Sequence, residues 1–254
     1  MTRNPGRGQA GDARMSFTAH LEELRSRLIK CGLALIVAFV GCFSISEFIF
    51  SILTAPLLSL EVQGLGLIGT GVSEAFFVKI KVAFVGSVFL SLPVLLWQIW
   101  QFVVPGLFEH EIHYARAFVF FGTFFFLLGA WFCYEVIFRV GYGFLLKTYE
   151  SIDVRPAIRI SEYLTFSSKL LLAFGVVFEL PVLAFFLARI GLIDHHFLIR
   201  QFRYAILVIF CLAAVLTPPD IVSQVLLALP LTGLYSISIA VAYFARRKDG
   251  SSSE

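Results

Sequence analysis

The stretch LLLAFGVVFELPVLAFFLA, residues 170–188, decides the fold class of this chain. It contains one charged side chain, Glu179, at its midpoint and no other polar side chain. A helix needs about 20 apolar residues to cross the hydrocarbon of a bilayer, so the stretch predicts a transmembrane helix. Such a helix would place Glu179 where an acidic side chain costs most, about 2.5 to 3.5 kcal/mol.

Further apolar runs lie on both sides of this stretch. The six predicted spans cover residues 28–50, 82–102, 117–138, 170–190, 204–216 and 222–244. The composition agrees, because 59% of the 254 residues are hydrophobic and only 15% are charged, which is more apolar surface than a soluble core of this size can bury. We therefore predict an all-α, polytopic integral membrane protein with six transmembrane helices.

The distribution of positive charge predicts the orientation. Most of the 20 Lys and Arg fall in segments that lie on one side of a six-span chain, namely 1–30, 103–116, 188–203 and 245–254. The positive-inside rule places these segments, and both termini, in the cytoplasm. We expect a cytoplasmic (inner) membrane location, with a disordered extension over residues 1–15, a membrane domain over 16–244 and a cytoplasmic tail over 245–254.

The fifth run, residues 204–216, is shorter than a bilayer requires. As a helix it would span about 20 Å against about 30 Å of hydrocarbon, so it would thin the membrane or fail to cross it fully. Pro218 and Pro219 cannot continue the helix, so runs five and six should form a hairpin of short helices. On the opposite, outer side, the loop around Pro56 and the charged stretch 139–169 are expected to pack as caps.

Glu179 has two interpretations. Either it faces a wet cavity, a polar partner or another chain, or it is a neutral acid satisfied within its own bundle. Pro181 favours the first interpretation, because a proline inside a helix leaves a nearby backbone carbonyl without its donor.

Residues 16–28 form the second candidate site. Apolar side chains recur there at helical spacing, opposite the charged residues Glu22, Glu23, Arg25 and Arg27. The pattern predicts an amphipathic helix at the membrane interface. Ion pairs at i,i+3 and i,i+4 would equally steady an ordinary surface helix, so the pattern alone does not assign a function.

The loop over residues 105–111 is the third candidate site. It carries Glu109 and Glu111 and follows the aromatic and amide side chains of residues 97–102. Tryptophans at a span end are typical of the headgroup belt. The two carboxylates would also suit a cationic peptide, because a guanidinium matches a carboxylate in bidentate geometry.

Enzymatic chemistry is not indicated. The sequence has no GxxxxGK[ST], HExxH or GxSxG motif and no intramembrane pair of aspartates, so we expect no catalytic residue and no cofactor. The four cysteines lack CxxC spacing and the histidines fall at predicted loops or helix ends, so no metal site is assigned. The net charge of +3 is spread between apolar runs, which argues against nucleic-acid binding.

Six blocks, in order along the chain, resemble motifs of the TatC family. They are HLEELRSRL (20–28), APL (55–57), Glu74 with Phe76 and Lys81, QIWQF (98–102) followed by PGL (105–107) and Glu111, FG (174–175) with FELPV (178–182), and LTPPD (216–220) with Ser223 and Gln224. The resemblance implies a non-enzymatic receptor in the lipid bilayer that binds twin-arginine signal peptides of folded precursors. It further implies assembly with the single-span proteins TatA and TatB, self-association, and transport driven by the proton-motive force.

The resemblance also implies roles for particular residues. The signal-peptide site would comprise Glu23, Arg25, Phe102 and Glu111. Glu179 would face a concave intramembrane surface, and Pro56 would belong to a periplasmic cap. Partner helices would dock near Thr217, Asp220 and Gln224.

Three positions depart from the family pattern. Arg139 stands where proline is usual, Ser236 stands where an acid is common, and Ile112-His113 replaces a basic pair, for which Arg116 offers a substitute. The alternative function is a secondary transporter or ion channel that uses Glu179 as its membrane-embedded carboxylate. That alternative predicts solute flux by this chain alone, whereas a translocase subunit requires its partners.

Overall fold

The computed structural model describes residues 17–60, 66–103, 113–150, 154–217 and 220–245. The expectations for the extension 1–15 and for the loop 105–111 fall outside these residues, as does the expectation for the tail beyond Ala245.

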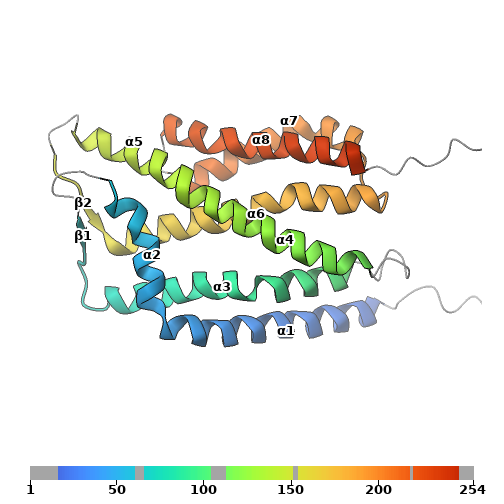
Figure 1. Ribbon diagram of the computed structural model, residues 1–254, viewed down its shortest axis with the longest axis horizontal. Helices are drawn as coiled ribbons and strands as arrows, with labels where there is room; N and C mark the ends of the chain where they lie inside the picture. Colours follow the sequence, from blue (N-terminus) through green and yellow to red (C-terminus); the bar gives the residue numbers. More distant parts are fainter. Residues whose placement is uncertain (1–16, 61–65, 104–112, 151–153, 218–219, 246–254) are drawn as a thin grey trace, which may run out of the picture.

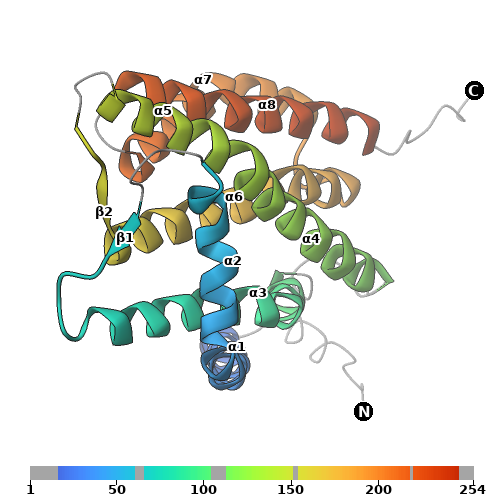
Figure 2. The same cartoon turned by 60° about the vertical axis from the view of Figure 1, so that its left-hand side comes forward.

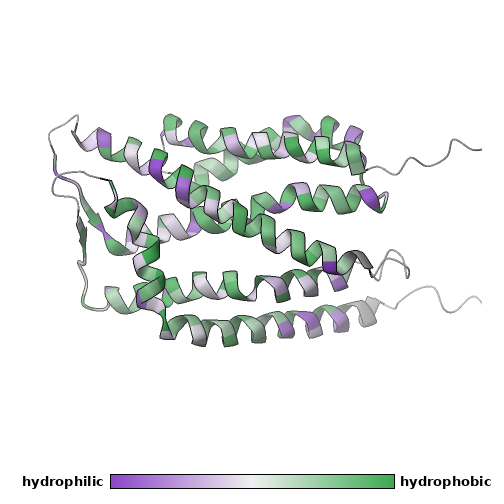
Figure 3. Ribbon diagram, viewed as in Figure 1, coloured by the Kyte–Doolittle hydropathy of each residue, from purple (hydrophilic) through white to green (hydrophobic). Residues whose placement is uncertain are grey.

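Six helical segments of the described chain are long and apolar enough to cross a membrane, which confirms the predicted fold class. They are α1 (Phe17–Ser44), α3 (Glu74–Val103), α4 (His113–Phe132) continuing through the π-helical turn η2 (Cys133–Ile137) into α5 (Phe138–Glu150), α6 (Ile160–Arg189), α7 (His195–Leu216) and α8 (Ile221–Ala245). Figure 3 shows that these helices are mostly hydrophobic, with hydrophilic residues concentrated toward their ends.

The spans lie side by side in a bundle (Figure 1). α1 packs along α3, α4 crosses α6, and α6 also packs on α8, which pairs with α7. We call the end where α1, α4 and α7 begin and α3, α6 and α8 end the terminal face. The opposite end is the cap, which contains α2 (Ser46–Leu58) and the parallel pair of strands β1 (Gly66–Ile68) and β2 (Ala157–Arg159). Figure 2 shows α2 running crosswise to α1, which is seen end-on in this view.

The predicted first span is wrong at both ends. α1 begins at Phe17, so residues 17–28 are the first part of a single long helix and not a separate interfacial helix. The chain turns at Ile45, so the end of the predicted span belongs to α2. No proline or glycine marks this turn; α2 buries Leu53 and Leu57 in the core, and an exposed ion pair links it to α3, with Lys79 Nζ 2.7 Å from Glu47 Oε1. The hydrogen bond from Lys79 lowers the pKa of Glu47.

The charged stretch 139–169 is more helical than predicted. α5 continues to Glu150 and α6 begins at Ile160. Within the helix that continues from α4 into α5, Arg139 lies 3.0 Å from Glu135 at the i,i+4 spacing that favours a helix. Arg159, the last residue of β2, lies 3.1 Å from Glu162 in the first turn of α6.

Of the six described spans the fifth is the shortest, with 22 residues, as predicted, whereas the sixth, with 25 residues, is longer than the first, with 24. α7 nevertheless has 22 residues, or about 33 Å at the rise of an α-helix. The apolar run 204–216 is only its second half, and the first half carries polar side chains. The helix is therefore longer than its apolar run, because polar residues extend it, while the thinning of the membrane at this short apolar run stays a prediction.

Two tyrosines fasten α2 to the bundle. Pro56 lies inside α2 and lacks the N–H that would bond to the carbonyl of Ile52. The hydroxyl of Tyr134, in η2, donates to that carbonyl at 2.9 Å. The hydroxyl of Tyr163, in α6, donates to the carbonyl of Leu53 at 2.6 Å. The proline in α2 thus creates the free acceptor that a distant helix uses.

Tyr134→Phe is expected to lower the free energy of unfolding by about 1 kcal/mol, because the Ile52 carbonyl loses its donor. Adding Pro56→Ala should recover part of this loss, since alanine restores an N–H to that carbonyl. Thermal unfolding in detergent would compare the four proteins of this cycle, with Tyr149→Phe, which changes an exposed side chain, as control. Strictly additive losses would contradict the shared acceptor.

α4 and α6 approach closely because two glycines lie at their crossing. A Cβ added to Gly129 would lie 2.6 Å from the carbonyl oxygen of Phe174, and one added to Gly175 would lie 2.7 Å from the ring of Phe126. Small residues permit this kind of close helix packing in membranes. The crossing fixes where α4 and α6 place their polar side chains.

Candidate functional site at the terminal face and in the membrane

A polar network joins α1 to α3 at the terminal face. Arg27 donates from Nε to Oε1 of Glu23 at 3.0 Å, and its Nη2 contacts the same oxygen. Its Nη1 donates to Oε1 of Gln101 at 2.7 Å and reaches Oε1 of Gln98 at 3.5 Å. The side chains of Glu23 and Arg27 are 22% and 16% exposed, so the pair is half-buried and strengthened relative to a fully solvated one. The arrangement presents a carboxylate and amide oxygens, a set suited to cationic donors.

The structure treats the four predicted signal-peptide residues differently. Glu23 belongs to the network, and Phe102 lies half-buried at the end of α3, directly after Gln101. Arg25 is exposed on α1 outside the Arg27 contacts. Glu111 lies outside the described residues. The structure therefore brings Glu23 and the end of α3 together and leaves the place of Glu111 a prediction.

Arg27 and Gln101 are the residues that the sequence prediction missed. Two signals were available: Glu23 and Arg27 are spaced i,i+4, and Gln98 and Gln101 are amides at the end of a span. The sequence could not show that these two features meet, because 74 positions separate Arg27 from Gln101.

Glu179 lies in the middle of the apolar run 170–188, ten residues before the end of α6 at Arg189, and is 7% exposed. Neither of its carboxylate oxygens has a hydrogen-bond partner among the described residues. The carboxylate faces α4, where a Cβ added to Gly122 would lie 3.1 Å from Oε2. The described part of the bundle thus accommodates the carboxylate beside Gly122 but gives it no hydrogen bond. That a wet cavity or a polar partner supplies the hydrogen bond stays a prediction.

Thr217, Asp220 and Gln224 come together where α7 turns into α8. Asp220 Oδ1 accepts the N–H of Ser223 at 2.7 Å, which caps the start of α8. Gln224 Nε2 donates to the carbonyl of Phe210 at 3.0 Å and ties α8 to α7. The Thr217 hydroxyl donates to its own helix, to the carbonyl of Ala213 at 2.9 Å. All three therefore have structural tasks, while partner docking stays a prediction.

Glu74 organises the cap, a role that its motif did not indicate. Its Oε2 accepts the N–H of Thr70 at 2.6 Å and that of Gly71 at 3.1 Å. Its Oε1 accepts the N–H of Ser161, in the first turn of α6, at 3.1 Å. One carboxylate thus joins the start of α3 to the start of α6, two segments that are remote in sequence.

The departures from the family pattern have local partners where they are described. Arg139 pairs with Glu135 across the π-helical turn, and Ser236 donates within α8 to the carbonyl of Thr232 at 3.0 Å. Ile112 lies outside the described residues.

One group within the described residues has ligand types and distances compatible with a metal ion. Asp194, His195 and His196, at the start of α7, offer ligand atoms within 4.8 Å of one another. His195 Nδ1 lies 2.6 Å from Asp194 Oδ1, a hydrogen-bond distance rather than the separation of two ligands around a shared ion.

Comparisons with known proteins give a consistent result. The family described as "Sec-independent protein translocase protein (TatC)" matches residues 19–230. The TatC protein of Desulforapulum autotrophicum is 44% identical over 240 residues, which cover 94% of this chain and 88% of that protein. The TatC protein of Campylobacter jejuni is 44% identical over 223 residues, 87% of this chain and 91% of that protein.

The solved structures agree with the sequences. A crystal structure of "Twin Arginine Translocase Receptor- TatC" superimposes with a TM-score of 0.82 at 33% identity and covers 90% of this chain and 100% of that one. The alternative of a secondary transporter or ion channel built on Glu179 finds no support in these comparisons.

Proposed function

This chain belongs to the TatC family, and we propose that, as the receptor subunit of the twin-arginine translocase, it binds twin-arginine signal peptides of folded precursors at its terminal face. The role is one of recognition and transport and not of enzymatic catalysis. The proposal includes Glu23, Arg25, Phe102 and Glu111 as the peptide site.

The network around Glu23 is the observation that carries the proposal. Both contacts from Arg27 fall on Oε1 of Glu23, so among the described residues Oε2 is the oxygen left for an incoming guanidinium. Arg27 in turn is held by Gln101, which fixes the carboxylate before the peptide arrives. A preorganised acceptor loses less conformational entropy on binding than a freely rotating one. Glu111 would supply the second carboxylate, and Phe102 an apolar contact beside it.

The orientation and the partners belong to the same proposal. The excess of Lys and Arg near the terminal face supports a cytoplasmic location for it, in the inner membrane. TatA and TatB would dock near Thr217, Asp220 and Gln224, and copies of the chain would associate in the receptor complex. The proton-motive force would drive transport. Glu179, buried without a partner among the described residues, would gain a hydrogen bond from a polar group of a partner helix or peptide.

The test compares a twin-arginine signal peptide with its twin-lysine counterpart on the membrane-reconstituted protein. Lysine keeps the positive charge but cannot make the bidentate hydrogen bonds of a guanidinium, so we expect about five-fold tighter binding of the arginine peptide. Glu111→Ala is expected to remove this preference, whereas Glu109→Ala, which changes an acid in the same loop, is expected to keep it. Equal binding of both peptides to the unaltered chain would reject the proposed site.

A further inference from the structure

A cavity of about 480 Å³ lies between α3 and α4. α3 contributes Pro93 and Trp97, and α4 contributes Arg116, Phe120, Thr123 and Leu127. The signal-peptide network uses none of these six residues. The peptide proposal therefore does not account for this cavity.

The length of the cavity matches one leaflet of a bilayer. From Arg116 to Leu127 the wall of α4 extends about 16 Å, against about 15 Å for half of the hydrocarbon thickness. Arg116 lies near the start of α4, at the terminal face. Side chains on a helix lean toward its N-terminus, and a long basic side chain places its charge at the headgroups. The cavity thus runs from headgroup level toward the centre of the membrane.

The lining residues define the chemistry of the occupant. Arg116 is the single charged residue among them, and no acid accompanies it in this lining. Phe120 is 68% exposed and Phe124 is 53% exposed, so the wall offers apolar surface to something outside the described bundle. An occupant that satisfies both features has an apolar chain and a negative group at one end.

We propose that this cavity binds one anionic phospholipid of the leaflet at the terminal face. The phosphate lies at Arg116 and an acyl chain follows Trp97, Phe120 and Leu127 toward the membrane centre. The site is a lipid-binding site separate from the peptide site, and it does not depend on the peptide proposal.

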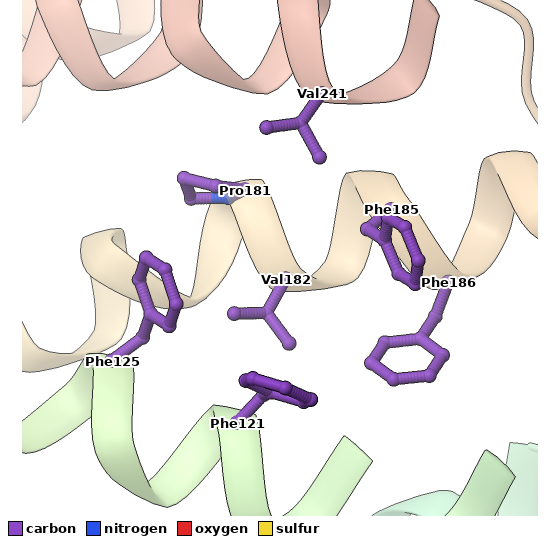
Figure 4. A pocket seen from close by; sticks show the side chains of 7 residues that line it. All are labelled: Phe121, Phe125, Pro181, Val182, Phe185, Phe186 and Val241. Atoms are coloured by element: carbon purple, nitrogen blue, oxygen red, sulfur yellow. The ribbon is translucent and has the colours of Figure 1, made fainter. Parts of the chain in front are cut away.

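A second cavity provides a contrast (Figure 4). It measures about 220 Å³ and lies between α4, α6 and α8, with Phe121 and Phe125 facing Val182 and Phe186, and Val241 above them. All of its lining residues are apolar. An apolar site of this kind could hold an acyl chain, but it has no charged side chain that would prefer one lipid headgroup over another. A preference for anionic headgroups is therefore expected only at the cavity that contains Arg116.

Tryptophan fluorescence measures the occupancy directly, because Trp97 lines the cavity. The protein would carry Trp131→Phe, since Trp131 is 60% exposed and would meet any lipid. A companion with Trp97→Phe as well gives the signal of Trp100, which is buried. Quenching is recorded in phosphatidylcholine vesicles that contain increasing fractions of brominated phosphatidylglycerol or brominated phosphatidylcholine.

Half-maximal quenching of Trp97 is expected at an about five-fold lower fraction of the brominated anionic lipid, the effect of one favourable basic contact at a membrane surface. Arg116→Gln is expected to make the two lipids equivalent, while Thr123→Val, a lining change of equal size away from the phosphate, keeps the preference. Equal quenching in the unaltered cavity, a preference that survives Arg116→Gln, or no quenching of Trp97 by either lipid would each overturn the proposal.

Discussion

Glu23→Gln is expected to weaken the binding of a twin-arginine signal peptide by about 10- to 100-fold, the range for loss of a hydrogen bond to a charged group. Glutamine keeps the shape of the side chain but removes the negative charge that a guanidinium seeks. It also loosens Arg27, whose contacts with Glu23 orient the carboxylate. Titration of labelled peptide onto the reconstituted protein would measure the change.

Glu22→Gln is the matched control for this experiment. Glu22 precedes Glu23 on α1 and is exposed, outside the contacts of Arg27. The two variants change the net charge equally, so general attraction would weaken binding equally in both. A site-specific role requires a much larger loss for Glu23→Gln, and similar losses in the two variants would reject it.

Gly129→Val is expected to lower the free energy of unfolding by about 2 to 3 kcal/mol, at the upper end of what overpacking costs. The added Cβ would lie 2.6 Å from the carbonyl oxygen of Phe174 and 2.7 Å from the side chain of Phe178. A backbone carbonyl cannot rotate away as a side-chain end can, so α4 and α6 must separate. The midpoint of thermal unfolding in detergent, with the yield of monodisperse protein, would measure the effect.

Gly143→Val is the control for the glycine prediction. Gly143 lies in the same continuous helix, in α5, and an added Cβ there meets nothing within 4 Å. Both variants change helix propensity alike, so their difference isolates the crossing of α4 and α6. An unchanged midpoint for Gly129→Val would mean that the two helices are not held at this separation.

The helical membrane fold could be predicted because hydrophobicity and length are local properties. Each apolar run identifies a span by itself, and the charges between the runs predict the sidedness of the chain. The Glu179 stretch could be placed at mid-membrane for the same reason, and α6 contains it as predicted. The helix ends were harder to predict, because α5 and α6 continue beyond the apolar runs into polar sequence.

The candidate peptide site was predicted only in part. Glu23 and Arg27 are neighbours on one helix, and their pairing follows from i,i+4 spacing. Their connection to Gln101 does not, because it requires α1 and α3 to lie side by side.

The sequence alone therefore determined the number of spans, their approximate positions and the depth of Glu179, because these depend on the apolar character of each segment. Tertiary structure decided the turn at Ile45, the crosswise course of α2 and the partners of Pro56, Glu74 and Arg27. These features depend on contacts between segments far apart in the chain. A donor such as the Tyr134 hydroxyl reaches the carbonyl freed by Pro56 only after the helices have packed.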